Sequence, residues 1–324
     1  MIYTRRFHRK YLRISQEKNP VLHFSPHIWD TLPTSMSFPK FFFALVLALF
    51  AFASCHKKEK ADQKPLILVS IAPYRTLVQQ IAGPSFDVQT IVPSSANPHS
   101  FEPILSQVTQ MGRADVWFSI GEPFEAKIAP ILQARNPQFM VTDLREGLSL
   151  IEEVPSFGGH SCLADRHIWL SPKLTKLQAE TIEKALSQKY PENKTLFLKN
   201  RLALCEQLTA LDEEIRSILK ETKNRTLLVS HPAFGYFCKE FNLHQLSVEY
   251  EGKDPRPKHL AAILKQATEE SAQIALALPQ YNNKGAQLIA EKLHKPVRYI
   301  DPYSEGYFEM MRKLALLIAD PYAN

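Results

Sequence analysis

Three histidines and one aspartate, far apart in the sequence, could together hold a divalent metal ion. His99, His167, His231 and Asp301 each stand in a short turn-like segment beside an apolar run. Three imidazoles and one carboxylate make a complete ligand set for a borderline cation such as Zn²⁺, whereas a second carboxylate would favour the harder Mn²⁺. We therefore predict one metal site, with zinc preferred and manganese as the alternative, if the fold brings these residues together.

Each of the four residues also has an ordinary structural interpretation. His99 could be a solvated loop histidine, and His167 could pack against Trp169. His231 could bond to a backbone carbonyl, and Asp301 could cap the last helix. Spacing alone does not decide between these interpretations and metal binding, so the local sequence around each residue carries more weight.

The segments around the four residues are distinctive when they are taken together. They read Asn-Pro-His from residue 97, Asp-Arg-His-Ile-Trp-Leu-Ser-Pro from 165, Ser-His-Pro-Ala-Phe-Gly-Tyr-Phe from 230 and Ile-Asp-Pro from 300. A further segment, Tyr-Glu-Gly-Lys-Asp-Pro, begins at residue 250. In kind and order these segments resemble those of the metal-binding lipoproteins that serve zinc and manganese ABC importers. The resemblance extends from about residue 65 to the C-terminus.

This resemblance implies a function and a set of partners. Its metal ligands would be His99, His167, His231 and Asp301, held between two lobes. The protein would capture a cation outside the cytoplasm and deliver it to an inner-membrane ABC permease with a cytoplasmic ATPase. We expect a monomer without enzymatic activity or catalytic residues. The alternatives are a zinc-dependent hydrolase, for which no His-Glu-x-x-His pair occurs in the sequence, and an adhesin or structural lipoprotein with a structural metal.

Three residues depart from the segments of this family. Arg166 stands where a proline precedes the second histidine, Pro232 replaces an acid after the third, and Leu278 replaces an acid before Pro-Gln. Arg166 could place a positive charge near the metal unless it points away or pairs with Asp165. The His-rich loop of many zinc importers is missing, and we assign no metal role to the isolated His160.

The N-terminal region predicts export and a lipid anchor. An unbroken apolar run ends at Ser54-Cys55 and is too short to span a membrane, which indicates a signal peptide over residues 36–54. The segment around Cys55 resembles a bacterial lipobox, so we expect lipidation at Cys55 and an anchor and tether over residues 55–64. Residues 1–35 form an extension that is not translated if Met36 is the start. We expect a lipid-anchored periplasmic protein.

Charge and cysteine content bear on two further questions, whether the protein binds nucleic acid and how its cysteines pair. The chain carries a net charge of +6 from 39 basic and 33 acidic residues. Residues 1–35 contribute +4 to this net charge and Lys40 contributes +1, which leaves +1 for residues 55–324. A nucleic-acid partner is therefore not expected. With Cys55 lipidated, Cys162, Cys205 and Cys238 remain, and the sequence does not decide how they pair.

Apolar periodicity predicts an α/β protein of two lobes with mainly parallel sheets, joined by a long backbone helix. The expected divisions are an N-terminal metal-binding lobe over residues 65–190, a linking helix over 191–221 and a C-terminal metal-binding lobe over 222–324. Short apolar runs that alternate with helical stretches indicate parallel sheets. The expected strands cover residues 66–71, 88–92, 114–120 and 141–144 in the first lobe, and 225–229, 246–248, 273–278 and 297–300 in the second.

Overall fold

The computed structural model describes residues 64–152, 164–222, 225–249 and 255–322. The chain divides into two units, Met1–Asp62 and Gln63–Asn324, and all described residues belong to the second. The predicted extension, signal peptide, Cys55 anchor and tether to residue 64 therefore lie almost wholly outside the described residues. Within the described ranges, no helix has both the length and the apolar character needed to cross a membrane.

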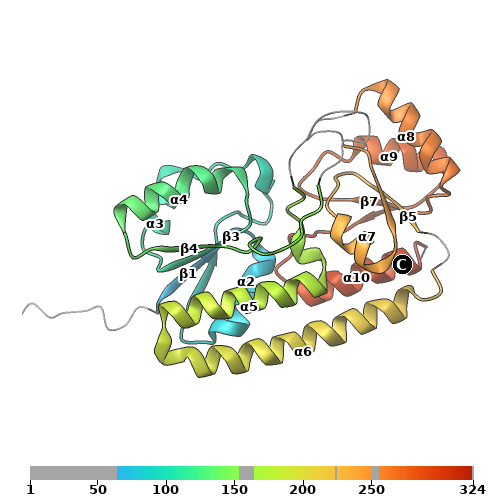
Figure 1. Ribbon diagram of the computed structural model, residues 1–324. Helices are drawn as coiled ribbons and strands as arrows, with labels where there is room; N and C mark the ends of the chain where they lie inside the picture. The colour runs from blue at the N-terminus through green and yellow to red at the C-terminus, as the bar shows by residue number, and fades with distance from the viewer. Residues whose placement is uncertain (1–63, 153–163, 223–224, 250–254, 323–324) are drawn as a thin grey trace, which may run out of the picture. The chain divides into compact units, whose positions relative to one another are not determined.

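The first lobe is built on a four-stranded parallel sheet. Its strands have the order β2-β1-β3-β4, and Ile67 of the central strand lies opposite both Val88 and Val116. The apolar central strands are largely buried, as expected for strands covered on both faces. The strands are β1 (Leu66–Val69), β2 (Asp87–Thr90), β3 (Val116–Ser119) and β4 (Met140–Asp143), and the helices are α2 (Ala72–Ala82), α3 (Leu105–Met111) and α4 (Pro123–Arg135), as Figure 1 shows.

The second lobe repeats this arrangement. Its sheet is again parallel and has the order β6-β5-β7-β8, so each lobe has its first strand beside its second and third. This topology confirms the predicted fold class of two parallel-sheet lobes. The strands are β5 (Thr226–Val229), β6 (His244–Ser247), β7 (Ala275–Ala277) and β8 (Val297–Tyr299), and the helices are α7 (Gly235–Phe241), α8 (Pro257–Glu269), α9 (Lys284–Leu293) and α10 (Tyr307–Ala319).

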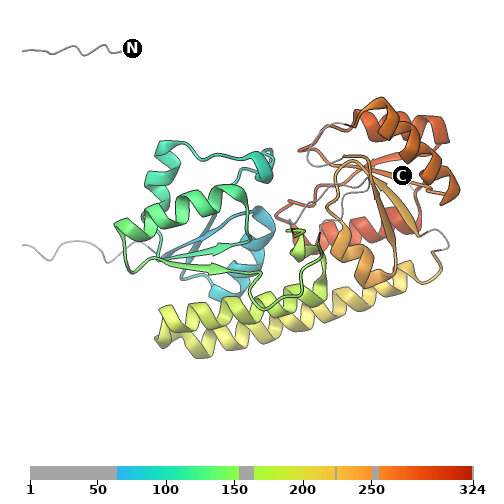
Figure 2. The ribbon, with the colours of Figure 1, turned by 45° about the horizontal axis from the view of Figure 1, so that its top comes forward.

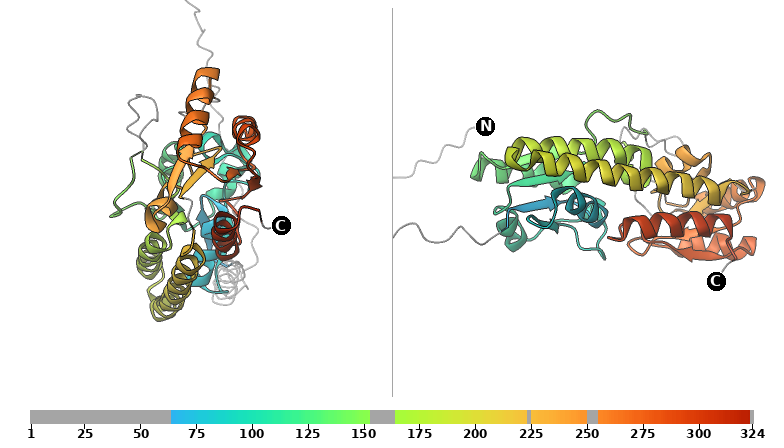
Figure 3. Two further views of the ribbon diagram at one scale, coloured as in Figure 1. Left: turned by 90° about the vertical axis from the view of Figure 1, so that its right-hand side faces the viewer. Right: turned by 90° about the horizontal axis from the view of Figure 1, so that it is seen from below.

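Two long helices connect the lobes. Helix α5 (Pro172–Lys189) has Ser171 as its N-cap, and the Ser171 hydroxyl accepts a hydrogen bond from Leu174 N. Helix α6 (Lys194–Leu219) is 26 residues long, about 39 Å at 1.5 Å per residue. It packs against α2 of the first lobe, against α10 of the second and alongside α5 (Figures 1 and 3). The predicted connecting helix is thus confirmed.

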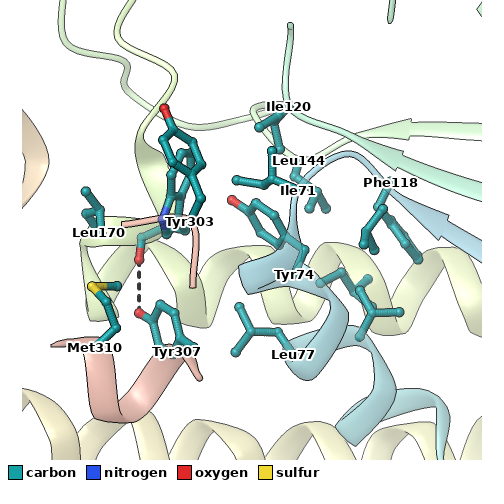
Figure 4. Close-up of a cluster of buried hydrophobic side chains, with 14 of the residues drawn as sticks. Ile71, Tyr74, Leu77, Phe118, Ile120, Leu144, Leu170, Tyr303, Tyr307 and Met310 are labelled. Carbon is teal, nitrogen blue, oxygen red and sulfur yellow. Dashed lines mark hydrogen bonds between the residues drawn. The ribbon is translucent and has the colours of Figure 1, made fainter. Parts of the chain in front are cut away.

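The larger of two hydrophobic cores in the described residues extends through both lobes. Trp169 is fully buried where they meet, and its indole N–H donates to Pro302 O over 2.9 Å. The hydroxyl of Tyr307 donates to Trp169 O over 2.9 Å. In Figure 4 a dashed line ends at this hydroxyl, among the buried side chains of the core. A smaller core lies between the second sheet and helices α8 and α9. Shared packing therefore holds the loops of one lobe opposite those of the other (Figure 2).

Two features of the first lobe differ from what the sequence predicts. Pro103 predicts a helix that has this proline in its first turn, but α3 begins at Leu105 with Ile104 at its N-cap, so this prediction is wrong by two positions. Helix α4 was not predicted. It has proline at its first position and Pro130 inside, and its apolar residues do not form one clear stripe. Its residues acquire helical structure by packing on the first sheet rather than from a strong local pattern.

The buried face of α6 offers a direct test of its structural role. Leu208 is fully buried on this helix, whereas Leu202 is 48% exposed on the same helix. We expect Leu208→Ala to lower the free energy of unfolding by about 2–5 kcal/mol, because it removes buried methyl groups and leaves a cavity. Leu202→Ala should change it by no more than about 0.5 kcal/mol. Urea unfolding of both variants measures the difference, and equal losses would contradict this packing.

Candidate metal-binding site

Three of the four predicted residues meet between the lobes. Within the described part of the chain, His99, His167 and His231 form a group whose ligand nitrogen atoms all lie within 4.8 Å of one another. Their ring centroids are 5.1, 5.2 and 5.3 Å apart in pairs, so the rings form a nearly equilateral triangle. Three side chains separated by more than 60 residues each therefore converge on one point.

The carboxyl ends of the parallel strands place two of these histidines. His99 follows β2 on the short 3₁₀ helix Pro98–Ser100, and its backbone N–H donates to the Asn97 side chain. His231 comes two residues after β5. Ligands of open parallel sheets gather at this edge. His167 has a different origin, because it lies in the segment that connects the first lobe to α5 and precedes the 3₁₀ helix Ile168–Leu170.

A carboxylate orients each of the three imidazoles. The Nδ1 atom of His99 lies 2.9 Å from Glu122, that of His167 lies 2.8 Å from Asp165 and that of His231 lies 2.7 Å from Glu249. Because a carboxylate accepts, each Nδ1 carries the proton and each Nε2 keeps its lone pair. Histidines that bind metals show this pairing, since the carboxylate fixes the ring and raises the basicity of the ligating nitrogen.

The lone pairs converge closely. Nε2 of His99 and Nε2 of His231 are 3.2 Å apart. In a tetrahedral zinc site with Zn–N distances of about 2.05 Å, two ligand nitrogens are about 3.3 Å apart. Two neutral imidazoles that face each other through lone pairs repel, and a cation between them removes the repulsion. The geometry thus suits a small divalent cation.

Burial and charge explain why a proton is a poor substitute for that cation. His231 is 5% exposed and His167 is fully buried. Burial, and then repulsion from His167 and His99, lower the pKa of His231 well below its ordinary value. Burial alone would raise the pKa of Glu122, but its hydrogen bond with His99 and nearby positive charge outweigh burial, and the net pKa is lowered. Both shifts favour a charged Glu122 and a neutral His231 near neutral pH.

The structure places Asp301 beside this group and not within it. Its Oδ1 accepts from the Gln280 side-chain amide over 2.9 Å and from Tyr303 N over 2.9 Å. Gln280 also donates to Ser94 O of the first lobe over 2.8 Å. Asp301 is not a member of the group of three histidines. Its predicted role as fourth ligand stays a prediction.

Two tyrosines that the sequence analysis did not identify contact the histidines. The Tyr281 ring stacks on His231 with centroids 3.8 Å apart and an interplanar angle of 11°. The Tyr303 hydroxyl lies 3.0 Å from Nε2 of His167 and 2.8 Å from the Tyr281 hydroxyl. Burial raises the pKa of Tyr303 well above its ordinary value, so a neutral hydroxyl is present at neutral pH. Both tyrosines belong to the second lobe, and their hydroxyls are hydrogen-bonded to each other.

Two of the departures from the family segments, Arg166 and Leu278, make contacts outside the three-histidine cluster. Arg166 donates through Nε to Gly121 O over 2.7 Å, close to the carboxylate that orients His99. Leu278 is fully buried, and its N–H donates to Ser230 Oγ over 3.2 Å. Gly235 allows the second lobe to approach Asp165, because a Cβ at Gly235 would lie 2.6 Å from an Asp165 carboxylate oxygen.

The two cysteines that the structure describes are not part of the three-histidine group. Cys205 and the buried Cys238 are free thiols, and burial raises the pKa of Cys238. Cys162 and His160 lie outside the described residues. The class that fold and site define is a two-lobed α/β protein with three converging histidines between parallel-sheet lobes.

Comparison with known proteins identifies the family. The family of periplasmic zinc-uptake complex component A proteins, ZnuA, matches residues 67–320. A protein of Chlamydia trachomatis, provisionally named as metal-binding, is 31% identical over 286 residues, which cover 86% of this chain and 99% of that protein. The chain therefore belongs to the ZnuA family, whose members are solute-binding components of periplasmic metal uptake.

Other relatives agree with this assignment. The zinc-binding lipoprotein AdcA of Streptococcus pneumoniae is 28% identical over 261 residues, which cover 78% of this chain and 52% of AdcA. The chain thus spans about half of AdcA. A solved ZnuA structure has a TM-score of 0.74 and 30% identity and covers 80% of this chain and 99% of that one. The Lmb protein of Streptococcus agalactiae, described as an adhesin with metal transporting activity, has a TM-score of 0.69, 25% identity and coverage of 79% and 98%.

A buried acid behind the site predicts a pH effect on stability. Glu125 is 5% exposed and accepts hydrogen bonds from Ser70, Ile120 N and Gly121 N. Burial raises its pKa to about 7 from the ordinary 4.5. The folded state then binds more protons than the unfolded state between these values, so its stability falls as pH rises from about 4.5 to 7. The loss amounts to about 3 kcal/mol.

The variant Glu125→Gln should lack this dependence, because its amide does not titrate. Urea unfolding at several pH values should show the wild type losing stability relative to Glu125→Gln as pH rises through this window. Glu102→Gln, an exposed acid of the same lobe that pairs with Lys127, is the control and should follow the wild type. Parallel stability curves for wild type and Glu125→Gln would contradict the assignment.

Proposed function

We propose that this protein captures one zinc ion through His99, His167 and His231 and delivers it to a membrane permease. The observation that carries the proposal is the set of three carboxylate-paired imidazoles whose ligating nitrogens converge within 4.8 Å. If the histidines had only a structural role, one hydrogen-bond partner for each ring would be enough. Their ligating nitrogens would not need to converge. Repelling lone pairs in a buried site are costly without a cation to bind them.

The chemistry of the ligands favours zinc over manganese. Three neutral imidazoles suit Zn²⁺, whereas Mn²⁺ prefers a larger share of oxygen ligands. Relatives support this preference, because AdcA is named as zinc-binding and a ZnuA deletion variant with 30% identity and a TM-score of 0.74 was solved with zinc bound. A manganese-bound neighbour with 17% identity supports only the fold. Mn²⁺ is the alternative cargo.

Asp301 is proposed as the fourth ligand. The hydrogen bonds that the described residues make to this carboxylate, from Gln280 and from Tyr303 N, go to Oδ1. The other oxygen, Oδ2, would then bind the cation. A fourth ligand at the margin of the site suits a transport protein, because a cargo ion must leave again.

The proposed context is an ABC importer. The protein would be exported by a signal peptide over residues 36–54, anchored in the membrane by lipidated Cys55 and tethered through residue 64. Lobes over residues 65–190 and 222–324, joined by residues 191–221, would present the loaded cation to the permease, and a cytoplasmic ATPase would drive transport. We propose a monomer that binds no nucleic acid.

Two other functions have less support. A zinc hydrolase keeps an open coordination position and a general base for water, whereas here the three carboxylates nearest the histidines, Glu122, Asp165 and Glu249, already hold Nδ1 atoms. We therefore propose that the protein is not an enzyme. An adhesin whose metal is only structural is the other alternative, and slow or absent exchange of bound zinc would favour it.

The test of this proposal compares two His-carboxylate pairs of the second lobe. His231 pairs with Glu249 inside the cluster, and His244 pairs with Glu270 on the surface at 2.6 Å. We expect the wild type and His244→Ala to bind one zinc per chain, and His231→Ala to bind at least tenfold more weakly, because one of three imidazole ligands is lost. Elemental mass spectrometry and titration against a chromophoric chelator measure stoichiometry and affinity. Equal binding by the two variants would refute the site.

A further inference from the structure

The hydroxyl of Tyr303 lies within hydrogen-bonding distance of His167 Nε2, one of the nitrogen atoms that the proposed site needs. Tyr303 is 2% exposed, and its oxygen is 3.0 Å from Nε2 of His167. Tyr303 follows β8 in the second lobe, whereas His167 belongs to the segment that leaves the first. The contact therefore joins two parts of the chain that both contribute to the site.

The direction of the hydrogen bonds follows from the protons available. Nδ1 of His167 donates its proton to Asp165, so Nε2 is an acceptor and the Tyr303 hydroxyl must be the donor. That hydroxyl has no second proton. The bond between the two tyrosine hydroxyls must then run from Tyr281 to Tyr303, over 2.8 Å. A donor that itself accepts a hydrogen bond is polarised and donates more strongly.

A single nitrogen lone pair cannot accept this proton and bind a cation at the same time. We propose, on the basis of the zinc-binding function above, that the Tyr303 hydroxyl competes with the cation for Nε2 of His167 and that Tyr281 strengthens this competition. Binding of the cation requires the Tyr303 hydroxyl to turn away from His167, and release of the cation allows it to return. The tyrosine pair thus lowers affinity and favours discharge of the cargo.

The position of the two rings fits this role. The stacking of Tyr281 on His231 keeps its hydroxyl next to Tyr303. The Tyr303 backbone N–H donates to Asp301, the proposed fourth ligand. The hydroxyl that blocks one ligand is therefore carried by the same short segment that supplies another.

The experiment removes single hydroxyl groups and keeps the rings. We expect Tyr303→Phe to bind zinc about threefold to tenfold more tightly than the wild type, which is the net worth of one hydrogen bond. Tyr281→Phe should change affinity in the same direction by a smaller factor. Tyr307→Phe is the control, because Tyr307 is an equally buried tyrosine of the same lobe whose hydroxyl bonds Trp169 O and no histidine. Its zinc affinity should equal that of the wild type.

Affinity is measured with the full chain by competition with a chromophoric zinc chelator. The near-ultraviolet tyrosine difference spectrum provides a second measurement, since it should change when zinc displaces the Tyr303 hydroxyl and lose most of that change in Tyr303→Phe. Equal or weaker zinc binding by folded Tyr303→Phe would overturn the proposal. If that variant fails to fold by circular dichroism, Tyr281→Phe decides by the same criterion. A wild type without stoichiometric zinc would instead refute the proposed function itself.

Discussion

Three hydrogen bonds between carboxylates and imidazole Nδ1 atoms determine what this site can do. Glu122, Asp165 and Glu249 each hold one histidine so that its Nε2 lone pair points to a shared centre. The carboxylates also supply negative charge behind the rings, which favours a divalent cation at the shared centre. Without them the rings could rotate and keep their lone pairs apart. The remaining structure serves to bring three such pairs together from three separate segments.

The repeated architecture of the lobes explains how this convergence arises. Both sheets are parallel and have equivalent strand orders, so the loops at their carboxyl edges are the natural places for ligands. Helix α6 contacts both lobes, and buried Trp169 bonds to the second lobe through Pro302 O. Since one core extends through both lobes, the distance between the two halves of the site is constrained by packing and not by a flexible linker.

Much of this arrangement could be predicted from the sequence, and the parts that could not have physical reasons. Alternating apolar runs identified the strands and helix α6, and local segments identified His99, His167 and His231. The roles of Glu122 and Glu249 escaped prediction because each contacts a histidine 18 or more positions away. The sequence did hold one signal for Glu122, because this acid follows the carboxyl end of β3, where ligands gather. Tyr281 and Tyr303 gave no signal, since tyrosines in such loops more often only fill the core.

The central claim is that three Nε2 atoms bind one zinc ion, and X-ray absorption spectroscopy of the zinc-loaded protein tests it most directly. Imidazole rings produce characteristic multiple scattering, so the number of histidine ligands can be counted. The account predicts three imidazole nitrogens at about 2.0–2.1 Å, with the rest of the shell made of oxygen. Two or fewer imidazoles, or a sulfur ligand at about 2.3 Å, would contradict it.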